Sequence, residues 1–257
     1  MQSYENRLNG QLVIGLLFLF ATLLAFESTN LDIVIQRLFY QEPQHAWLLS
    51  SSDKVMRLIF YDGIKAILIL FSLLLLTLIV LSKLPGRRVK LDVGPLLVVL
   101  LSMITVPSLV AELKQITNVA CPKNTVQFGG PVRGIPLFAR YSDFNRPIKQ
   151  QKCFPAAHAS AGFSLMSLMF LFSTRRNRRI ALAFGCITGC IMGLYKMALG
   201  DHFLSHTIVS MEIAWIVVVA IARLLLTPGQ PVPHSGYTRP GRVHDSENTS
   251  CQSRGGR

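Results

Sequence analysis

Two histidines near the end of the sequence have a spacing that places them on one helical face. His202 and His206 lie four residues apart in the stretch "YKMALGDHFLSH", from Tyr195 to His206. Residues at positions i and i+4 lie one above the other on a helix. A third histidine, His158, lies three residues after Pro155, near the start of another apolar stretch. Histidines beside apolar segments face a protein interior or a water-filled cavity more often than lipid. All three are therefore candidates for a functional site.

The histidines and two nearby lysines are the residue types that phosphoryl transfer requires. The reaction needs a nucleophilic imidazole, an acid for the leaving oxygen, and cations or amides around the phosphoryl oxygens. Lys114 and Lys196 each lie near the end of an apolar segment, on the side expected for His158. This pattern favours a histidine-dependent phosphoryl transfer.

A zinc site is the alternative interpretation. Histidines four residues apart occur in the His-Glu-x-x-His motif of metalloproteases, where the glutamate is the general base. Phe203 stands where that glutamate should be, and the lysines would repel a divalent cation. We therefore expect no metal and no other cofactor, with a metal-dependent membrane hydrolase as the less favoured reading.

The composition indicates a membrane protein. Of the 257 residues, 51% are hydrophobic and only 15% are charged, whereas soluble domains carry roughly 25% charged residues. The net charge is +13, and the basic residues lie between apolar runs. Membrane topology therefore explains this charge better than a nucleic-acid partner does. Six apolar segments are close to the ~20 residues that cross a bilayer: Leu8–Phe26, Ile64–Ser82, Gly94–Leu113, Phe154–Ser173, Ile180–Leu199 and Phe203–Thr227.

These segments predict an all-α bundle of six transmembrane helices, residues 1–227, followed by a disordered tail, residues 228–257. The stretches Lys83–Lys90 and Thr174–Arg179 each carry four basic residues, and the positive-inside rule places such loops in the cytoplasm. We expect a multi-pass protein of the cytoplasmic (inner) membrane with both termini in the cytoplasm. The candidate site then faces the periplasm or exterior, under an outward loop region.

The outward segment Lys114–Lys152 is unusually basic, with seven lysines and arginines and one acid. An anionic ligand is one explanation for this charge, and contact with water or with anionic headgroups is the other. Residues 31–39 alternate apolar and polar positions at helical spacing, which indicates either a helix in the membrane interface or a short helix of a loop domain. Cys121 and Cys153 share the outward side, where oxidation is possible, so we expect them to form a disulfide.

Three short motifs resemble those of the type 2 phosphatidic acid phosphatase superfamily, in its membrane-embedded bacterial branch. That family has Lys, six residues, Arg-Pro; then Pro-Ser-Gly-His; then Ser-Arg, five residues, His, three residues, Asp. This chain has "KQITNVACP" from Lys114, "PAAH" from Pro155 and "YKMALGDHFLSH" from Tyr195, in the same order and with the same internal spacing. The differences from the family lie at Cys121, Ala156, Ala157, Tyr195, Lys196 and His206.

The resemblance implies a role for each matching residue. His202 would be the nucleophile that forms a phosphohistidine, and His158 would protonate the leaving lipid oxygen and then activate water. Lys114 and Lys196 would hold phosphoryl oxygens, together with backbone amides of Ala156 and Ala157 at the start of a helix. Pro155 suits the first position of that helix. His206, where the family has Asp, would orient His202, with Asp201 and Glu212 as other candidates. Replacements for the missing arginines would come from the outward loop: Arg133, Arg140 and Arg146.

The resemblance also implies the substrate class. It indicates an enzyme, a lipid phosphatase or phosphotransferase, whose substrate in the bilayer is a lipid phosphate or diphosphate. Candidates are an isoprenyl diphosphate, lipid A, phosphatidylglycerol phosphate and phosphatidate, and the acceptor is either water or a second lipid. A catalytically silent protein that binds or transports lipid phosphates remains the alternative.

Overall fold

The computed structural model of the protein describes residues 2–84, 92–139, 141, 147 and 149–226. Arg140, Arg146, most of the basic loop after Lys83 and the predicted tail 228–257 lie outside these described residues. Within them the fold is mainly helical, and the only sheet is a short antiparallel pair, β1 (Tyr40–Gln41) and β2 (Ala46–Trp47).

Five helical segments are long and apolar enough to cross a membrane in the described part of the chain. These are α1 (Gln2–Ser28), the continuous run of α3 (Lys54–Arg57), η3 (Leu58–Gly63) and α4 (Ile64–Lys83), then α5 (Val93–Ile116), α7 (Arg175–Ala198) and α8 (Leu204–Leu225). The remaining short elements include α2 (Leu31–Gln36), η1 (Arg37–Phe39), η2 (Glu42–Gln44), η4 (Pro122–Asn124) and η5 (Val126–Phe128).

The sixth predicted span is shorter than the sequence indicated. It consists of α6 (Ala157–Phe163) and the 3₁₀ helix η7 (Ser164–Leu171), so the helix begins at Ala157 and not at Pro155. A 3₁₀ helix rises ~2.0 Å per residue against ~1.5 Å in an α-helix, so the two pieces together extend roughly 26 Å. The segment lies inside the bundle, against α5, α7 and α8.

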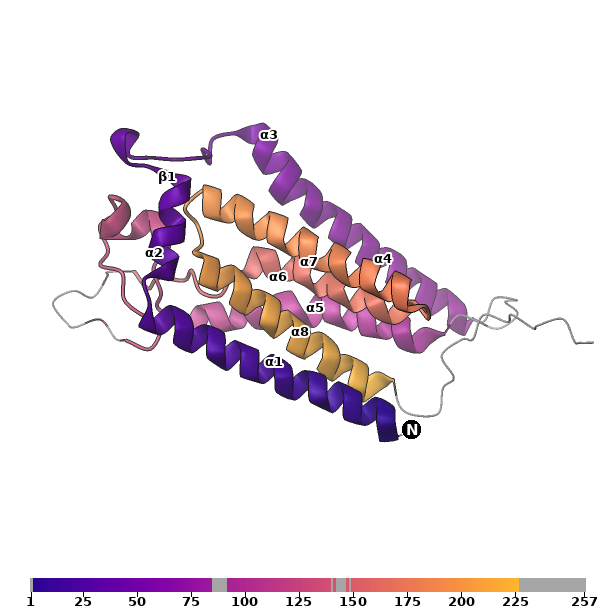
Figure 1. Ribbon diagram of the computed structural model, residues 1–257. Helices are drawn as coiled ribbons and strands as arrows, with labels where there is room; N and C mark the ends of the chain where they lie inside the picture. Colours follow the sequence, from indigo (N-terminus) through magenta and orange to yellow (C-terminus); the bar gives the residue numbers. More distant parts are fainter. Residues whose placement is uncertain (1, 85–91, 140, 142–146, 148, 227–257) are drawn as a thin grey trace, which may run out of the picture.

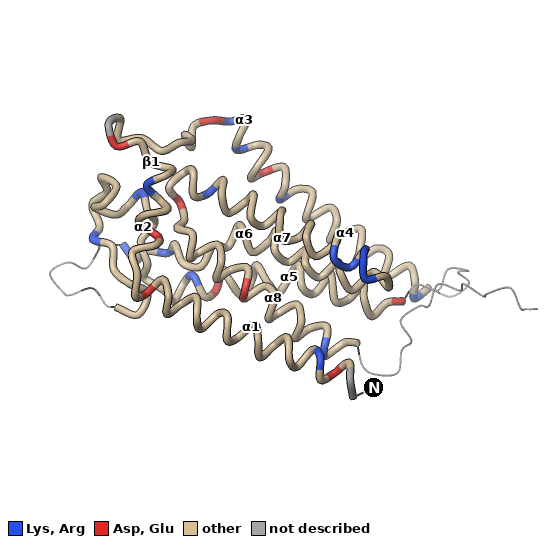
Figure 2. The backbone as a smooth tube through the Cα atoms, in the orientation of Figure 1, with Lys and Arg blue, Asp and Glu red and all other residues tan. Residues whose placement is uncertain are grey.

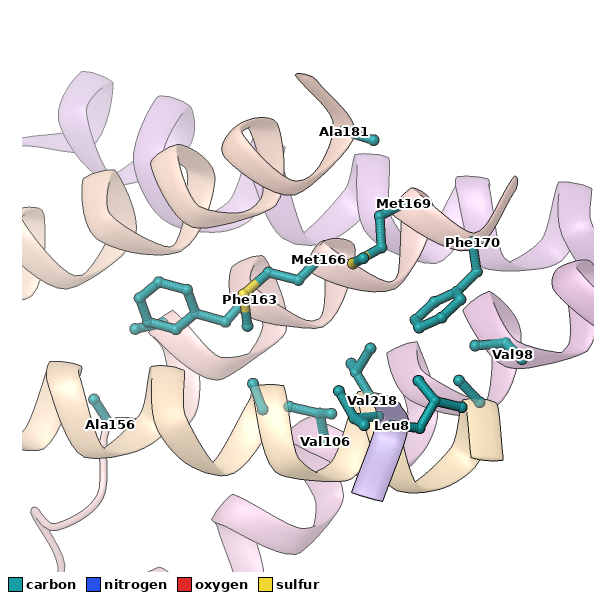
Figure 3. Close-up of a cluster of buried hydrophobic side chains, with 14 residues drawn as sticks. Leu8, Val98, Val106, Ala156, Phe163, Met166, Met169, Phe170, Ala181 and Val218 are labelled. Atoms are coloured by element: carbon teal, nitrogen blue, oxygen red, sulfur yellow. The ribbon is translucent and has the colours of Figure 1, made fainter. Parts of the chain in front are cut away.

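Small residues on α7 let this inner segment approach closely. A Cβ atom added to Gly189 would lie 2.2 Å from the ring of Phe163, and one added to Gly185 would lie 2.4 Å from the backbone nitrogen of Met166. Close helix approach at small residues is a common way to pack helices in membranes, where apolar burial drives association weakly. Phe163 and Met166 then fill the centre of the core between α5, α7 and α8 (Figure 3).

Charged residues gather toward the two ends of the bundle, and the stretch between them is mostly uncharged (Figure 2). The N-terminus, the end of α4 and the start of α7 lie at one end, and α2 lies at the other (Figure 1). The candidate histidines His158 and His202 lie toward the α2 end, because α6 and α8 both begin there. The arginines at the start of α7 therefore lie at the end away from the site, as the sequence predicted for that loop.

Candidate active site

Several contacts join the segment after α5 to the segment before α6. The predicted disulfide between Cys121 and Cys153 is present, with Cα atoms 5.1 Å apart, which confirms that expectation. The backbone N–H of Cys153 donates to the carbonyl of Val119 at 3.1 Å, and the Thr117 hydroxyl donates to the carbonyl of Phe154. The end of the helix that carries Lys114 is thus held against the start of the helix that carries His158.

The turn between α7 and α8 has a glycine at its centre. Gly200 has φ +71°, in the left-handed region, and a Cβ atom there would lie 2.3 Å from Trp47. The N–H of Asp201 donates to the carbonyl of Lys196, and the N–H of Gly200 donates to that of Met197, both at 2.9 Å. This pair of bonds is the Schellman ending of a helix, and it directs the chain into the His202 segment.

His202 and His206 form a buried pair. Their Nδ1 atoms lie 3.4 Å apart, and only 3% and 1% of the two residues is exposed. One of the two Nδ1 atoms donates and the other accepts. When Nδ1 of His202 is the donor, its Nε2 carries the lone pair. Burial, helped by the nearby charges of His206 and Lys114, lowers the pKa of His202 well below its ordinary value. This shift favours the neutral form of His202, in which one ring nitrogen keeps a lone pair.

The ring of His206 is fixed on its other faces by aromatic side chains. Phe154 and Phe203 contact it edge-on, with ring centroids 5.2 and 5.4 Å away. The N–H of Ala156 donates to the His206 carbonyl at 3.2 Å and to the Ser210 hydroxyl at 2.8 Å. The amide of Ala156, which the sequence suggested as a phosphate donor, is thus already used to join the second and third motifs.

His158 packs against a residue that the motifs did not indicate. Its ring lies 4.7 Å from that of Tyr61, and the ammonium of Lys196 lies 4.9 Å from the same Tyr61 ring. The Nδ1 atom of His158 is buried without a hydrogen-bond partner in the described residues. Buried polar atoms are nearly always paired, and an unpaired one at a site of this kind has a ready partner in a ligand. Tyr61 lies in the π-helical turn η3, a feature frequent at functional sites.

The cations of the site meet around one carboxylate. Asp201 binds Lys123 through Oδ1 at 2.6 Å and Lys196 through Oδ2 at 2.9 Å. Burial alone would raise the pKa of Asp201, but the hydrogen bonds and charges of the two lysines outweigh burial and lower it. Lys114 is close enough for its charge to act on Asp201, Lys196 and His202. The structure therefore brings the predicted residues Lys114, Lys196, His158, His202 and His206 together.

Asp201 and Glu212 have other partners than the sequence suggested. Asp201 binds lysines, as described above, and Glu212 accepts a hydrogen bond from Thr22 of α1 at 2.7 Å. Among the described contacts His202 bonds only to His206. Arg133 is exposed and forms no ion pair with the described residues, so its surroundings do not assign it to the site.

The sequence did not predict three residues that contribute to the site: Tyr61, Lys123 and Asp32. Lys123 had been counted only as part of the basic loop, although it follows the first motif directly. Asp32 belongs to α2 and binds Ser205, which lies between the two paired histidines. The sequence showed only that Asp32 is a charged residue on the polar face of the predicted helix 31–39. It did not show that Ser205 is the partner of Asp32.

An apolar groove leads from His158 between α4 and α5. It has a volume of about 510 Å³, and His158, Tyr61 and Lys65 lie in its wall together with apolar residues of α4, α5 and α6. Along α4 the lining extends from Lys65 to Leu73, which is roughly 12 Å by the helical rise. Volumes of this order hold small ligands.

Comparison with known protein families matches a model described as the PAP2 superfamily to residues 95–229, just over half of the chain. The chain belongs to the PAP2 superfamily. The matched range contains all three motifs, from Lys114 to His206, and it excludes α1 to α4. PAP2 membership makes this chain a phosphatase or phosphoryl-transfer protein in general terms. Neither a curated protein nor a solved structure matches the chain.

Proposed function

We propose that this PAP2 protein is an integral membrane enzyme that acts on a lipid phosphate or diphosphate without a metal, through a phosphohistidine at His202. The observation that carries the proposal is the position of His158. On one side of His158 lie Lys114, Lys196 and the buried His202. On the other side lies the apolar groove between the membrane helices. A substrate with a phosphate at one end and a lipid tail at the other fits both surroundings at once.

The first step is attack by His202. The Nδ1–H of His202 donates a hydrogen bond to His206. The Nε2 atom of His202 forms a bond to the substrate phosphorus, and the bond from phosphorus to the leaving oxygen breaks. Lys114 and Lys196 neutralise the phosphoryl oxygens. The amides of Ala157 and His158, at the first positions of α6, have no acceptor among the described backbone contacts. Free N–H groups at a helix start can donate hydrogen bonds to an anion.

His158 handles the protons in both halves of the reaction. It gives its proton to the leaving oxygen as the lipid departs, and it then takes a proton from the water that attacks the phosphohistidine. The nitrogen–phosphorus bond breaks, inorganic phosphate is released and His202 is free again. A second lipid in the place of water would give a phosphotransferase.

The same proposal includes the orientation in the membrane. The basic stretch Arg175–Arg179 and the N-terminus lie at the end opposite the site (Figure 2), and such stretches favour the cytoplasm. The site then opens on the outer face of the cytoplasmic membrane. An outer location is also where the disulfide between Cys121 and Cys153 would be maintained.

The experiment is phosphate release from a panel of lipid phosphates by purified protein, with and without EDTA. We expect His202→Ala to abolish turnover and the acid-labile phosphoprotein that forms with labelled substrate. His158→Ala should slow turnover by ~10²–10⁴-fold, the usual contribution of general acid catalysis. His45→Ala, at an exposed outer histidine, is the matched control and should keep full activity. Unchanged activity in His202→Ala would reject the mechanism, and binding without turnover in the wild type would favour a silent binding protein.

A further inference from the structure

A lysine that no motif indicates lies in the wall of the apolar groove beside His158. Lys65 is the second residue of α4, four residues after Tyr61, and both side chains line the groove with His158. Residues four apart share a helix face, so Tyr61 and Lys65 present one surface to His158. The charge of Lys65 also acts on His158.

No carboxylate in the described part of the chain pairs with Lys65. The nearest acid in the sequence, Asp62, lies 3.5 Å from Arg57 instead. The other ion pairs among the described residues join Asp201 to Lys123 and Lys196. Ionisable residues in membrane segments commonly mark a substrate or ion pathway, and a cation without an acidic partner suits an anionic substrate.

The positions of the charges give the site a direction. The cations that act on His202 are Lys114 and Lys196, whereas His158 is influenced by these two and also by Lys65. Lys65, and not Lys114 or Lys196, lines the groove where the lipid would lie. In the proposed mechanism, Lys65 is therefore on the leaving-group side of His158, and Lys114 and Lys196 are on the side of the phosphoryl group that is transferred.

We propose that Lys65 binds a phosphate on the leaving group, so that the preferred substrate is a lipid diphosphate and not a lipid monophosphate. The inference rests on the proposed function. His202 attacks the terminal phosphorus, and the bond from that phosphorus to the bridging oxygen breaks. The lipid monophosphate leaves with the electron pair and takes the proton of His158. Its phosphate gains negative charge as it leaves, and Lys65 neutralises that charge at the entrance to the groove.

A lysine at this level of a membrane helix also contacts the headgroups of ordinary lipids, and the test separates the two roles. Turnover is measured in detergent, without a bilayer, on two substrates with the same tail, farnesyl diphosphate and farnesyl monophosphate. The variants are Lys65→Met, which keeps much of the apolar stem, Lys65→Arg, which keeps the charge, and Lys54→Met, an exposed lysine at the start of the same continuous helix, as control.

We expect Lys65→Met to lower kcat/KM for the diphosphate by about tenfold or more, the usual weight of a hydrogen bond to a charged group. The kcat/KM of Lys65→Met for the monophosphate should stay within about twofold of wild type, because that substrate has no second phosphate for Lys65 to bind. Lys65→Arg should restore the preference, and Lys54→Met should leave both values unchanged. Equal losses on both substrates, or no loss, would overturn the role of Lys65. Wild-type protein that releases phosphate from neither lipid would instead remove the proposed function, and this inference with it.

Discussion

Asp32 accepts a hydrogen bond from the backbone N–H of Ser205 at 2.9 Å, and the Ser205 hydroxyl donates a second bond to the same carboxylate. Ser205 is the second residue of α8, and the residue before that helix, Phe203, has no side chain that could cap it. Asp32 therefore does for α8, from a distant part of the chain, what an N-cap residue normally does. The carboxylate fixes the backbone between His202 and His206.

We expect Asp32→Ala to lower both thermal stability and kcat. Loss of an N-cap costs about 1 kcal/mol, and the histidine pair loses a support beside it. Asp32→Asn should recover most of the stability, because an amide oxygen still accepts from Ser205. The control is Asp92→Ala, which removes the cap of α5 at the end far from the site and should lower stability alone. Equal kcat in Asp32→Ala and wild type would show that Asp32 only stabilises the fold.

The second prediction concerns the pH dependence of turnover. Burial lowers the pKa of His202, and attack requires its neutral form. On the acid side, activity should therefore be lost only as the pH falls below ~6.5, the ordinary histidine value. His158, which needs a proton to act as the acid, gives a separate loss at higher pH. The charged or titratable groups that face His202 are Lys114 of α5, His158 of α6, Lys196 of α7 and His206 of α8. The pH–rate profile of the wild type measures this acid limb, and a limb at or above pH 6.5 would contradict it.

Substitutions of His206 change that profile in opposite ways. His206→Asp places a carboxylate beside His202, which stabilises its protonated form, so the acid limb should move to higher pH. His206→Ala leaves the His202 Nδ1 unpaired, which costs about 1–3 kcal/mol, or roughly 5- to 160-fold in rate. Melting temperatures of both variants identify any loss of folding. A wild-type rate and profile in His206→Ala would reduce His206 to a packing residue.

The third prediction separates two roles for Asp201. Because its carboxylate joins Lys123 to Lys196, Asp201→Asn should let the two ammonium groups move apart and raise KM more than it lowers kcat. Lys123→Met should raise KM in the same direction. Asp62→Asn, at an exposed pair with Arg57, is the control. If kcat falls while KM stays constant, Asp201 acts on His202 and not on the lysines.

Reduction of the disulfide should weaken both fold and activity. The bond between Cys121 and Cys153 closes a loop of 32 residues, and the chain-entropy model gives ~3–4 kcal/mol for a loop of this size. We expect Cys121→Ser to lower the melting temperature and to slow turnover, because Lys114 and His158 are no longer held together. Cys186→Ser, at a free thiol of α7, should do neither. Labelling of both Cys121 and Cys153 by a thiol reagent in unreduced protein would contradict the bond.

The sequence predicted those parts of the site that depend on spacing along the chain. The apolar runs located the helices, and the motif spacing brought Lys114, His158 and His202 to one end of the bundle. Contacts between distant segments had no such signal. Nothing in the order of residues connects Asp32 to Ser205. Asp201 was only a second candidate, after His206, for orienting His202, and its side chain binds lysines instead.

The helix start at Ala157 was also missed, for a physical reason. A proline suits the first helical position, and Pro155 therefore indicated a start there. The amide of the next residue, Ala156, instead bonds to His206 and Ser210, which draws the chain out of helical geometry until Ala157. Tertiary hydrogen bonds outweighed the local preference.

The neighbours of α1 have a consequence for how the protein is made. In the finished structure α1 lies beside α8 (Figure 1), and α8 begins 176 residues after the last residue of α1. At synthesis rates of ~5–20 residues per second, α1 waits roughly 10–35 s for that partner. Its exposed side chains are mostly leucine, valine, isoleucine and phenylalanine, which a bilayer can shelter during the wait. Asp32 likewise waits for Ser205, so the hydrogen bonds that cap α8 beside the histidine pair form only after α5 and α7 have been made.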